Sequence, residues 1–144
     1  MWSNLTIFVN VIVFAVSICD EESVYFPHTG RCYKVYCDDF LSWSEARLKC
    51  KEMGRNGDLA SITDDATTQF IKKNFNFTEH TWFGGHRSSG GNWVWSDGSD
   101  WLYENWNSNQ PNDDGDVASY FYSQNGFFWW DEAAITKLMS FCQY

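Results

Sequence analysis

The sequence is short of prolines, of basic residues and of long apolar runs, and each shortage excludes a class of protein. Only 2 of its 144 residues are proline and 19% are aromatic, a composition that argues against an intrinsically disordered chain. Its 10 Lys and Arg residues face 19 Asp and Glu residues, and the resulting net charge of −9 argues against nucleic acid as a partner. A chain of this length suffices for one domain with one core.

Recognisable catalytic motifs are also missing. The histidines are not part of a Ser-His-Asp, nucleophile or His-Glu-x-x-His pattern. The adjacent carboxylates Asp113 and Asp114 do not set the separation that glycosidase chemistry needs. We therefore expect that the protein is not an enzyme.

The first 19 residues contain no Asp, Glu, Lys or Arg. Residues 5–18 are mostly apolar, but this run is too short and too interrupted for a comfortable transmembrane helix and suits the core of a signal peptide. Small residues permit cleavage after Ser17 or after Cys19. We predict a signal peptide at residues 1–19 and a secreted mature protein without a membrane span.

Two helices are predicted in the first half of the mature chain. Ser42 and Glu45 have the spacing of a capping box, and apolar residues follow at helical spacing up to Met53. Thr63 is expected to cap a second helix. The residues of that helix expected to face the core are Ala66, Phe70 and Ile71.

Strand-like runs follow the second helix, at residues 81–83, 93–95, 117–122, 127–130 and 138–142. Asn125-Gly126 favours a tight hairpin turn between two of them. Two helices followed by antiparallel strands predict an α+β domain over residues 24–144.

The segment from Trp93 to Asp116 combines tryptophans with Gly, Ser, Asn and Asp in a density that suits neither a helix nor a regular strand. Ordered loops of this length are usually functional. Side-chain oxygen donors gather at its end, a composition suited to a hard cation such as calcium. These residues are Gln110, Asn112, Asp113, Asp114 and Asp116.

Five cysteines in a secreted chain imply disulfides and one residue left over. A bridge between Cys50 and Cys142 would restrict the unfolded chain by roughly 4 to 5 kcal/mol in the loop-entropy model. Cys32 can bridge to Cys19, if cleavage retains Cys19, or to Cys37 across a turn. Cys37 is otherwise a free thiol or a link to a second copy of the chain.

With these features in hand, the sequence resembles the C-type lectin-like domain family. The resemblance covers essentially the whole mature chain, and eight pieces occur in the right order. They are GRCYKVY at 30–36, SWSEARLKC at 42–50, GDLASI at 57–62, TWFGG at 81–85, WVWSDGS at 93–99, ENWNSNQPN at 104–112, WWD at 129–131 and FCQY at 141–144. The resemblance implies a double-loop fold with two helices, antiparallel sheets and a long upper loop, in which calcium coordinates vicinal sugar hydroxyls.

The resemblance also implies a ligand set for one calcium ion. The family's Glu-Pro-Asn or Gln-Pro-Asp motif falls on Gln110-Pro111-Asn112, with Pro111 expected in cis. The next acidic ligand is Asp116 or Asp114, and the family's Trp-Asn-Asp motif supplies Asp131.

Three departures from the family pattern bear on function. Trp130 stands at the asparagine position of the Trp-Asn-Asp motif, where it can instead stack on a sugar. Gln110 and Asn112 are both neutral, so the calcium site is expected to be weak. The resemblance does not extend to the auxiliary calcium site of some family members, because Arg87 and Gly90 stand where that site would need acids.

These observations predict a secreted, calcium-dependent carbohydrate-binding protein, weak and galactose-leaning or broad in preference, that takes part in recognition of foreign glycans. The sugar would contact Gln110, Asn112, Asp116, Trp130 and Asp131, and the partners would be glycans or glycoproteins. The alternative is a calcium-independent member of the same family that binds a protein or another surface. The sequon Asn76-Phe77-Thr78 predicts N-glycosylation at Asn76.

Overall fold

The computed structural model describes residues 19–54, 56–123 and 126–144, so all of the predicted signal peptide except Cys19 lies outside the described residues. No helix in these ranges is long and apolar enough to cross a membrane. The elements in chain order are β1 (Val24–Phe26), β2 (Arg31–Leu41), α1 (Trp43–Lys51), β3 (Asp58–Leu59), α2 (Asp65–Asn74), β4 (Thr81–Arg87), β5 (Trp93–Trp95), β6 (Val117–Ser123), β7 (Gly126–Glu132) and β8 (Leu138–Gln143).

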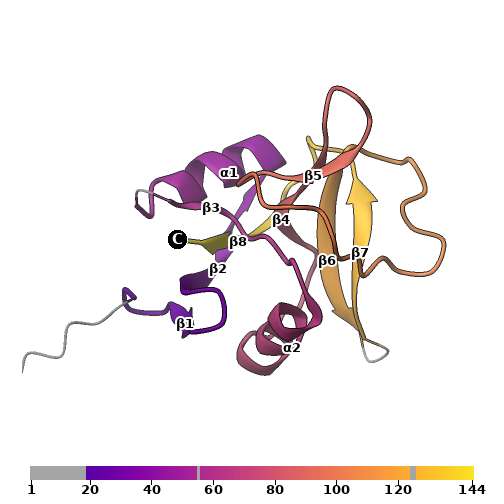
Figure 1. Ribbon diagram of the computed structural model, residues 1–144. Coiled ribbons are helices and arrows are strands. Elements are labelled where there is room, and N and C mark those ends of the chain that lie inside the picture. The colour runs from indigo at the N-terminus through magenta and orange to yellow at the C-terminus, as the bar shows by residue number, and fades with distance from the viewer. Residues whose placement is uncertain (1–18, 55, 124–125) are drawn as a thin grey trace, which may run out of the picture.

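The strands form one curled sheet in the order β1-β2-β8-β4-β6-β7, with β3 paired to β8 and β5 paired to β4 (Figure 1). Every strand pair is antiparallel except β4 and β8, which are parallel, so the predicted α+β class is confirmed with a mixed sheet instead of a purely antiparallel one. Figure 1 shows α1 and α2 apart from each other, with β6 and β7 at the end of the molecule far from the C-terminus.

Helix α1 begins as the capping-box spacing predicts. The Glu45 carboxylate accepts a hydrogen bond from the Ser42 backbone N–H at 2.8 Å and lies 2.5 Å from Lys137 Nζ. The contact with Lys137, followed by the hydrogen bonds from Ser42, lowers the pKa of Glu45 to about 2. Trp43, Ala46 and Cys50 recur at helical spacing and are buried on the inner face of the helix.

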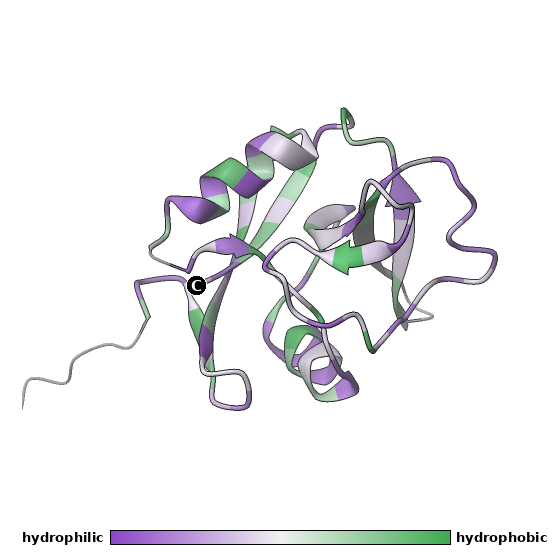
Figure 2. Ribbon diagram, turned by 45° about the horizontal axis from the view of Figure 1, so that its top comes forward, coloured by the Kyte–Doolittle hydropathy of each residue, from purple (hydrophilic) through white to green (hydrophobic). Residues whose placement is uncertain are grey.

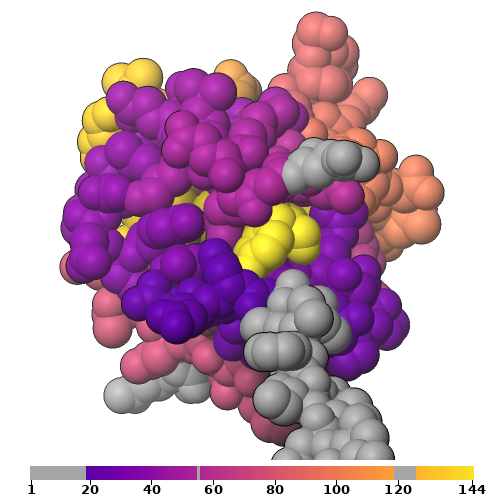
Figure 3. Space-filling model, turned by 90° about the vertical axis from the view of Figure 1, so that its left-hand side faces the viewer, coloured from indigo at the N-terminus to yellow at the C-terminus, as the bar shows by residue number. Residues whose placement is uncertain are grey.

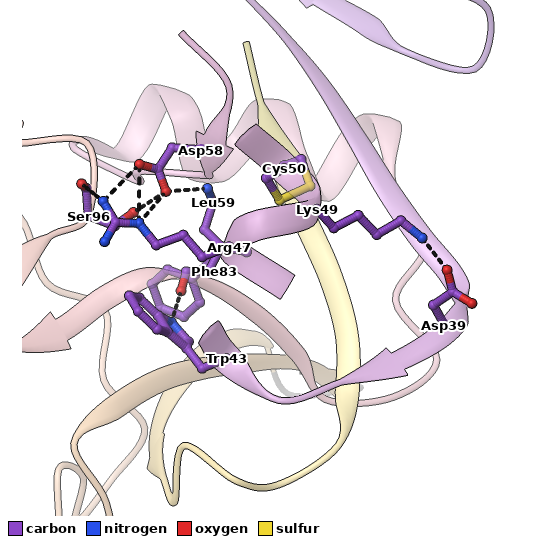
Figure 4. The surroundings of a disulfide bond; sticks show 10 residues. Asp39, Trp43, Arg47, Lys49, Cys50, Asp58, Leu59, Phe83 and Ser96 are labelled. Atoms are coloured by element: carbon purple, nitrogen blue, oxygen red, sulfur yellow. Dashed lines mark hydrogen bonds and ion pairs between the residues drawn. A yellow bond between two sulfur atoms is a disulfide. The ribbon is translucent and has the colours of Figure 1, made fainter. Parts of the chain in front are cut away.

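The disulfide between Cys50 and Cys142 joins α1 to β8, as predicted, and links positions 92 residues apart (Figure 4). Both cysteines are fully buried. Beside them the Trp43 indole N–H donates to the carbonyl oxygen of Phe83 on β4 at 2.9 Å. This helix is therefore fixed to both β8 and β4.

A second disulfide joins Cys19 to Cys32, which decides between the two partners that the sequence left open for Cys32. Cys37 carries a free, exposed thiol. At the bridged residue Cys32, the backbone N–H and C=O groups exchange two hydrogen bonds of 3.0 Å with those of Tyr144. The beginning of the described chain and the C-terminus thus lie on the same side of the molecule.

Helix α2 begins one residue later than predicted, because Asp64 and not Thr63 is its N-cap. The Asp64 carboxylate accepts from the Thr67 N–H at 2.7 Å and lies 2.7 Å from His28 Nε2. Thr67 and Ile71 are buried, whereas Ala66 is exposed, so the prediction that Ala66 faces the core was wrong. Neighbouring residues of a helix lie about 100° apart, and the buried face runs through Thr67, Thr68 and Ile71, which leaves Ala66 outside it.

We expect Asp64→Ala to lower the free energy of unfolding by about 1 kcal/mol, because Asp64 caps α2. Burial by itself would raise the pKa of Asp64, but the hydrogen bonds from His28 and Thr67 lower it below its ordinary value of 3.8. Its contribution is therefore present above about pH 3.8 and is lost as the pH falls through the lower pKa of the folded state. Urea unfolding between pH 2 and 7 should show a shallower acid limb for the variant, and parallel acid limbs would contradict this.

The core lies between the sheet and the two helices and is rich in aromatic side chains. Along β7 the residues alternate, with Phe127, Trp129 and Asp131 buried and the residues between them partly exposed. Figure 2 shows that α1 and α2 carry hydrophobic bands among hydrophilic ones, as expected of helices with one buried face. The arrangement presents Asp131 toward the inside of the molecule, at the end of β7 beside the long loop.

Candidate functional site

A cluster of tryptophans supports the long loop that follows β5. Trp129 on β7 is fully buried, and an isolated bridge pairs it with Trp106 of the loop. The ring centroids of Trp95 and Trp101 lie 4.4 Å apart, and those of Trp93 and Trp106 lie 4.8 Å apart. These aromatic side chains therefore anchor the loop and hold its end beside β7.

Gln110 and Asn112 both form hydrogen bonds with Asp131. The Asn112 backbone N–H donates to Asp131 Oδ1 at 2.9 Å, and the Asp131 backbone N–H donates to Gln110 Oε1 at 3.3 Å. The peptide bond between Gln110 and Pro111 is cis, as predicted. The structure thus brings Asp131 beside Gln110 and Asn112, from which it is 21 and 19 positions away in the sequence.

Asp131 carries the feature of this group that best suits a cation. The residue is 3% exposed, and its Oδ2 atom is buried without a hydrogen bond from any described residue. A buried carboxylate oxygen without a partner is costly, and a bound cation removes that cost. The side-chain oxygens of Gln110 and Asn112 are of the kind that calcium prefers, so the donor set fits a calcium ion.

Asp114 belongs to the same group through Asn112. Asn112 donates its side-chain amide to Asp114 Oδ2 at 2.6 Å, and the Asp114 N–H donates to Asn112 Oδ1 at 3.1 Å. The two alternatives for the acidic loop ligand are therefore placed differently, since the Asp116 carboxylate is 82% exposed and faces Arg87 Nε at 3.8 Å. Within the described ranges, no three His, Cys, Asp or Glu side chains gather as a metal-binding group.

The contacts of Arg87 with the long loop were not predicted from the sequence, which named Arg87 only as a residue that argues against an auxiliary calcium site. Arg87 stands at the end of β4, forms an ion pair with Asp113 and lies over the ring of Trp93, with 5.0 Å from its guanidinium carbon to the ring centroid. Its charge offsets that of the acidic loop. The sequence shows only that one basic residue, Arg87, precedes a loop rich in acidic residues. That pattern does not by itself indicate which of the acids Arg87 contacts.

Trp130 lies on the opposite side of β7 from Asp131, because neighbouring residues of a strand point to opposite faces. Its ring packs edge-on against His80, with 5.2 Å between centroids, and is partly exposed. His80 Nδ1 also lies 3.4 Å from Glu132. Contact between Trp130 and a sugar therefore stays a prediction, and it would involve this outer face of the hairpin.

Comparison of the sequence with protein-family models finds a match to the lectin C-type domain over residues 40–144. The chain belongs to the C-type lectin family. Its relatives include the C-type lectin lectoxin-Lio3 of Erythrolamprus poecilogyrus, 36% identical over 117 residues that cover 76% of this chain and 71% of that protein. Because this family is not enzymatic, the expectation that the protein is not an enzyme is confirmed.

Two solved structures illustrate the range of this fold. The C-type lectin domain of murine dendritic cell inhibitory receptor 2, solved in complex with an N-glycan, superposes with a TM-score of 0.79 at 26% identity and covers 88% of this chain and 98% of its own. A calcium-independent type II antifreeze protein shares the fold with a TM-score of 0.75 at 24% identity, covering 88% of this chain and 93% of its own. The predicted C-type lectin-like fold is thereby confirmed.

Proposed function

We propose that this C-type lectin binds one calcium ion at Asp131, Gln110, Asn112 and Asp114, and through that ion the hydroxyl groups of a glycan. The buried Asp131 Oδ2 atom without a partner carries the proposal. The bound ion would supply two coordination positions for vicinal hydroxyls, as an oxygen-liganded calcium site with open positions can. The glycan complex of the dendritic cell receptor supports a carbohydrate as the ligand.

The chemistry of Gln110 and Asn112 bears on the preferred sugar. Both side chains offer an amide that donates hydrogen bonds, whereas a carboxylate only accepts them. Hydroxyl protons of the sugar are then left to carboxylates, of which Asp131 accepts from the Asn112 backbone N–H and Asp114 from the Asn112 side-chain amide. We infer weak binding with a galactose-leaning or broad preference, in which Asp114 takes the acidic loop position and Asp116 contributes less.

Calorimetric titration of the purified protein with calcium, followed by a monosaccharide panel with and without excess chelator, tests this function. The expected result is a single weak calcium site and sugar binding that disappears in chelator. Sugar binding that persists unchanged in chelator would contradict the calcium-dependent mechanism.

One observation favours the alternative of a calcium-independent module that binds a protein or another surface. Arg87 already pairs with Asp113 and faces Asp116, so part of the negative charge of the loop is offset without any metal. In that case the same loop face would bind its partner directly. The chelator experiment distinguishes the two functions, since the alternative predicts binding that does not depend on calcium.

We further propose that the protein is secreted and that its signal peptide is cleaved after Ser17 in preference to Cys19. The bond between Cys19 and Cys32 can exist only if the mature chain retains Cys19. Cleavage after Ser17 is the alternative that retains it. The two disulfides among the described residues suit the oxidising environment of the secretory route.

N-glycosylation at Asn76 follows from the same proposal. Asn76 and Thr78 are exposed just after α2, whereas Phe77 between them is buried and fixes the segment. We expect the protein from eukaryotic secretory cells to lose one glycan's mass on treatment with peptide N-glycosidase F. The Asn76→Gln variant should show no such loss, while Asn74→Gln, which lies outside the sequon, should behave as the parent; an unglycosylated parent would contradict the prediction.

Cys37 is the proposed link between two copies. Partial desolvation and the negative charge of Asp38 raise the pKa of the Cys37 thiol, so its oxidation is expected to be slow. We expect non-reducing electrophoresis of secreted protein to show a dimer band that is absent for Cys37→Ser and after reduction. A parent protein that stays fully monomeric, with Cys37 titrating as a free thiol, would disprove the link.

A further inference from the structure

A polar hollow lies between the start of the sheet and the end of α1, and it shares no residue with the proposed calcium site. Its volume is about 350 Å³, at the small end of pockets for small ligands. Three basic residues of this acidic protein, Arg31, Arg47 and Lys51, line it together. The C-terminal residues, yellow in Figure 3, lie on this side of the molecule between the indigo first strand and the purple of α1 and the segment after it.

The first carboxylate in the hollow, Asp58, is already saturated by the protein. Its Oδ1 accepts from Arg47 Nε at 3.0 Å, from the Ser96 hydroxyl at 2.8 Å and from the Leu59 N–H at 2.8 Å, while Oδ2 accepts from Arg47 Nη2 at 3.1 Å. Figure 4 shows this convergence on Asp58. Asp58 is 6% exposed, so it has no oxygen to offer to a ligand.

The second carboxylate, Asp97, is in the same condition. Ser99 donates its backbone N–H and its hydroxyl to the two oxygens at 3.0 and 2.9 Å, and Gln143 donates to Oδ2 at 2.8 Å. Burial by itself would raise the pKa of Asp97, but hydrogen bonds from Ser61 and Ser99 and the charge of Arg31 lower it. Asp97 is therefore an ionised, buried support for Arg31, whose Nη2 lies 3.4 Å away.

Unlike the two carboxylates, some hydrogen-bond donors in the hollow have no partner among the described residues. Lys51 and Asn56 are exposed, and Lys51 forms no ion pair within the described residues. Arg31 has its Nη2 engaged by Asp97 and is 34% exposed. Arg47 is fixed by Asp58, by the Ser96 carbonyl at 2.6 Å and by the Trp43 ring, so its guanidinium is a pre-organised cation beside those of Arg31 and Lys51.

We propose that this hollow binds the anionic group, sulfate or carboxylate, of an acidic saccharide. Unused donors with saturated acceptors require a ligand that accepts hydrogen bonds and carries negative charge. Among the described residues the lining contains no aromatic or aliphatic side chain, which disfavours a nucleotide base or a lipid tail and suits a hydroxylated ligand. None of its residues belongs to the calcium group, so this site goes beyond the function proposed above.

Binding of a sulfated heparin disaccharide and of its unsulfated counterpart, measured by calorimetry at low and physiological salt, tests the proposal. We expect the sulfated probe to bind, and Lys51→Gln to weaken it roughly tenfold, as loss of a charged hydrogen bond does. Arg31→Gln should act in the same direction. Lys51 is the decisive position because it is exposed and its substitution leaves both buried carboxylates with their partners. The unsulfated probe, which retains the carboxylate, tells which anionic group is bound.

Lys72→Gln is the matched control, since Lys72 is an exposed lysine at the end of α2, outside the hollow. It should leave the affinity unchanged, and so should excess chelator, which separates this site from the calcium site. If Lys72→Gln weakened binding of the sulfated probe as much as Lys51→Gln does, the loss would come from the change in net charge alone. That result would overturn the proposal. Loss of binding in chelator would also overturn it, as would a disaccharide that binds no more tightly than inorganic sulfate.

Discussion

Cys50→Ala is expected to abolish the accumulation of folded protein in the medium of secreting cells. The bridge to Cys142 closes 92 residues, and its loss is expected to cost about 2 to 5 kcal/mol, a large share of the stability of a small extracellular domain. The substitution also leaves the Cys142 thiol buried in the core beside α1. Secreted yield and thermal unfolding of any recovered protein measure the effect.

The matched control for this variant is Cys37→Ser, which removes an exposed cysteine and leaves both disulfides within the chain in place. It should be secreted at the level of the parent and unfold at the same temperature. A Cys50→Ala variant that is secreted and unfolds like the parent would show that the packing of α1 suffices without the bridge. Peptide mapping that finds either Cys50 or Cys142 unpaired in the parent would have the same meaning.

The order of helices and strands could be predicted because it follows from local signals. The Ser42 and Glu45 spacing located the start of α1, since both capping groups lie within one turn. The start of α2 was placed one residue early, because Thr63 and Asp64 are both good N-caps. In the structure Asp64 is the N-cap, and it is also contacted by His28 from another part of the chain, a contact that local reasoning cannot predict.

Strand pairing was less accessible than strand positions. The parallel pair β4 and β8 joins Thr81 to Met139 and Trp82 to Ser140, across more than fifty positions of sequence. Nothing in either segment alone encodes its neighbour, since pairing depends on which faces the rest of the fold leaves to be buried. The family resemblance supplied the overall fold where periodicity could not.

The candidate site shows the same division between local and long-range information. Gln110 and Asn112 were found from a short motif, and Asp131 from a second motif that the fold brings beside the first. The separation of Asp114 from Asp116 was not accessible, because Arg87 on β4 draws Asp113 and Asp116 to itself. An ion pair between two distant elements depends on how far each side chain can reach in the folded protein. Periodic patterns in the sequence do not contain this information.

Arg87 also limits how strongly the loop can hold a cation. Calcium affinity rises with the number of charged ligands, and here the carboxylates beside Gln110 and Asn112 are those of Asp131 and Asp114. Asp113 and Asp116 can join them only by giving up Arg87. A weak site is therefore the physical expectation from the geometry, in agreement with the neutral motif residues.

Asp131→Asn is expected to abolish calcium binding and the calcium-dependent sugar binding, with an affinity loss of at least roughly a hundredfold. The substitution keeps the shape of the side chain and the acceptor for the Asn112 N–H, but removes the charge and the buried oxygen that lacks a partner. Without calcium the variant should be at least as stable as the parent, because an unpaired buried carboxylate oxygen costs about 1 to 3 kcal/mol. Added calcium should raise the melting temperature of the parent and leave that of the variant unchanged, since only a ligand of the folded state stabilises it. Asp116→Asn removes the same charge from an exposed position facing Arg87 and should retain most of the calcium response; an Asp131→Asn variant that still responds fully would place the ion elsewhere.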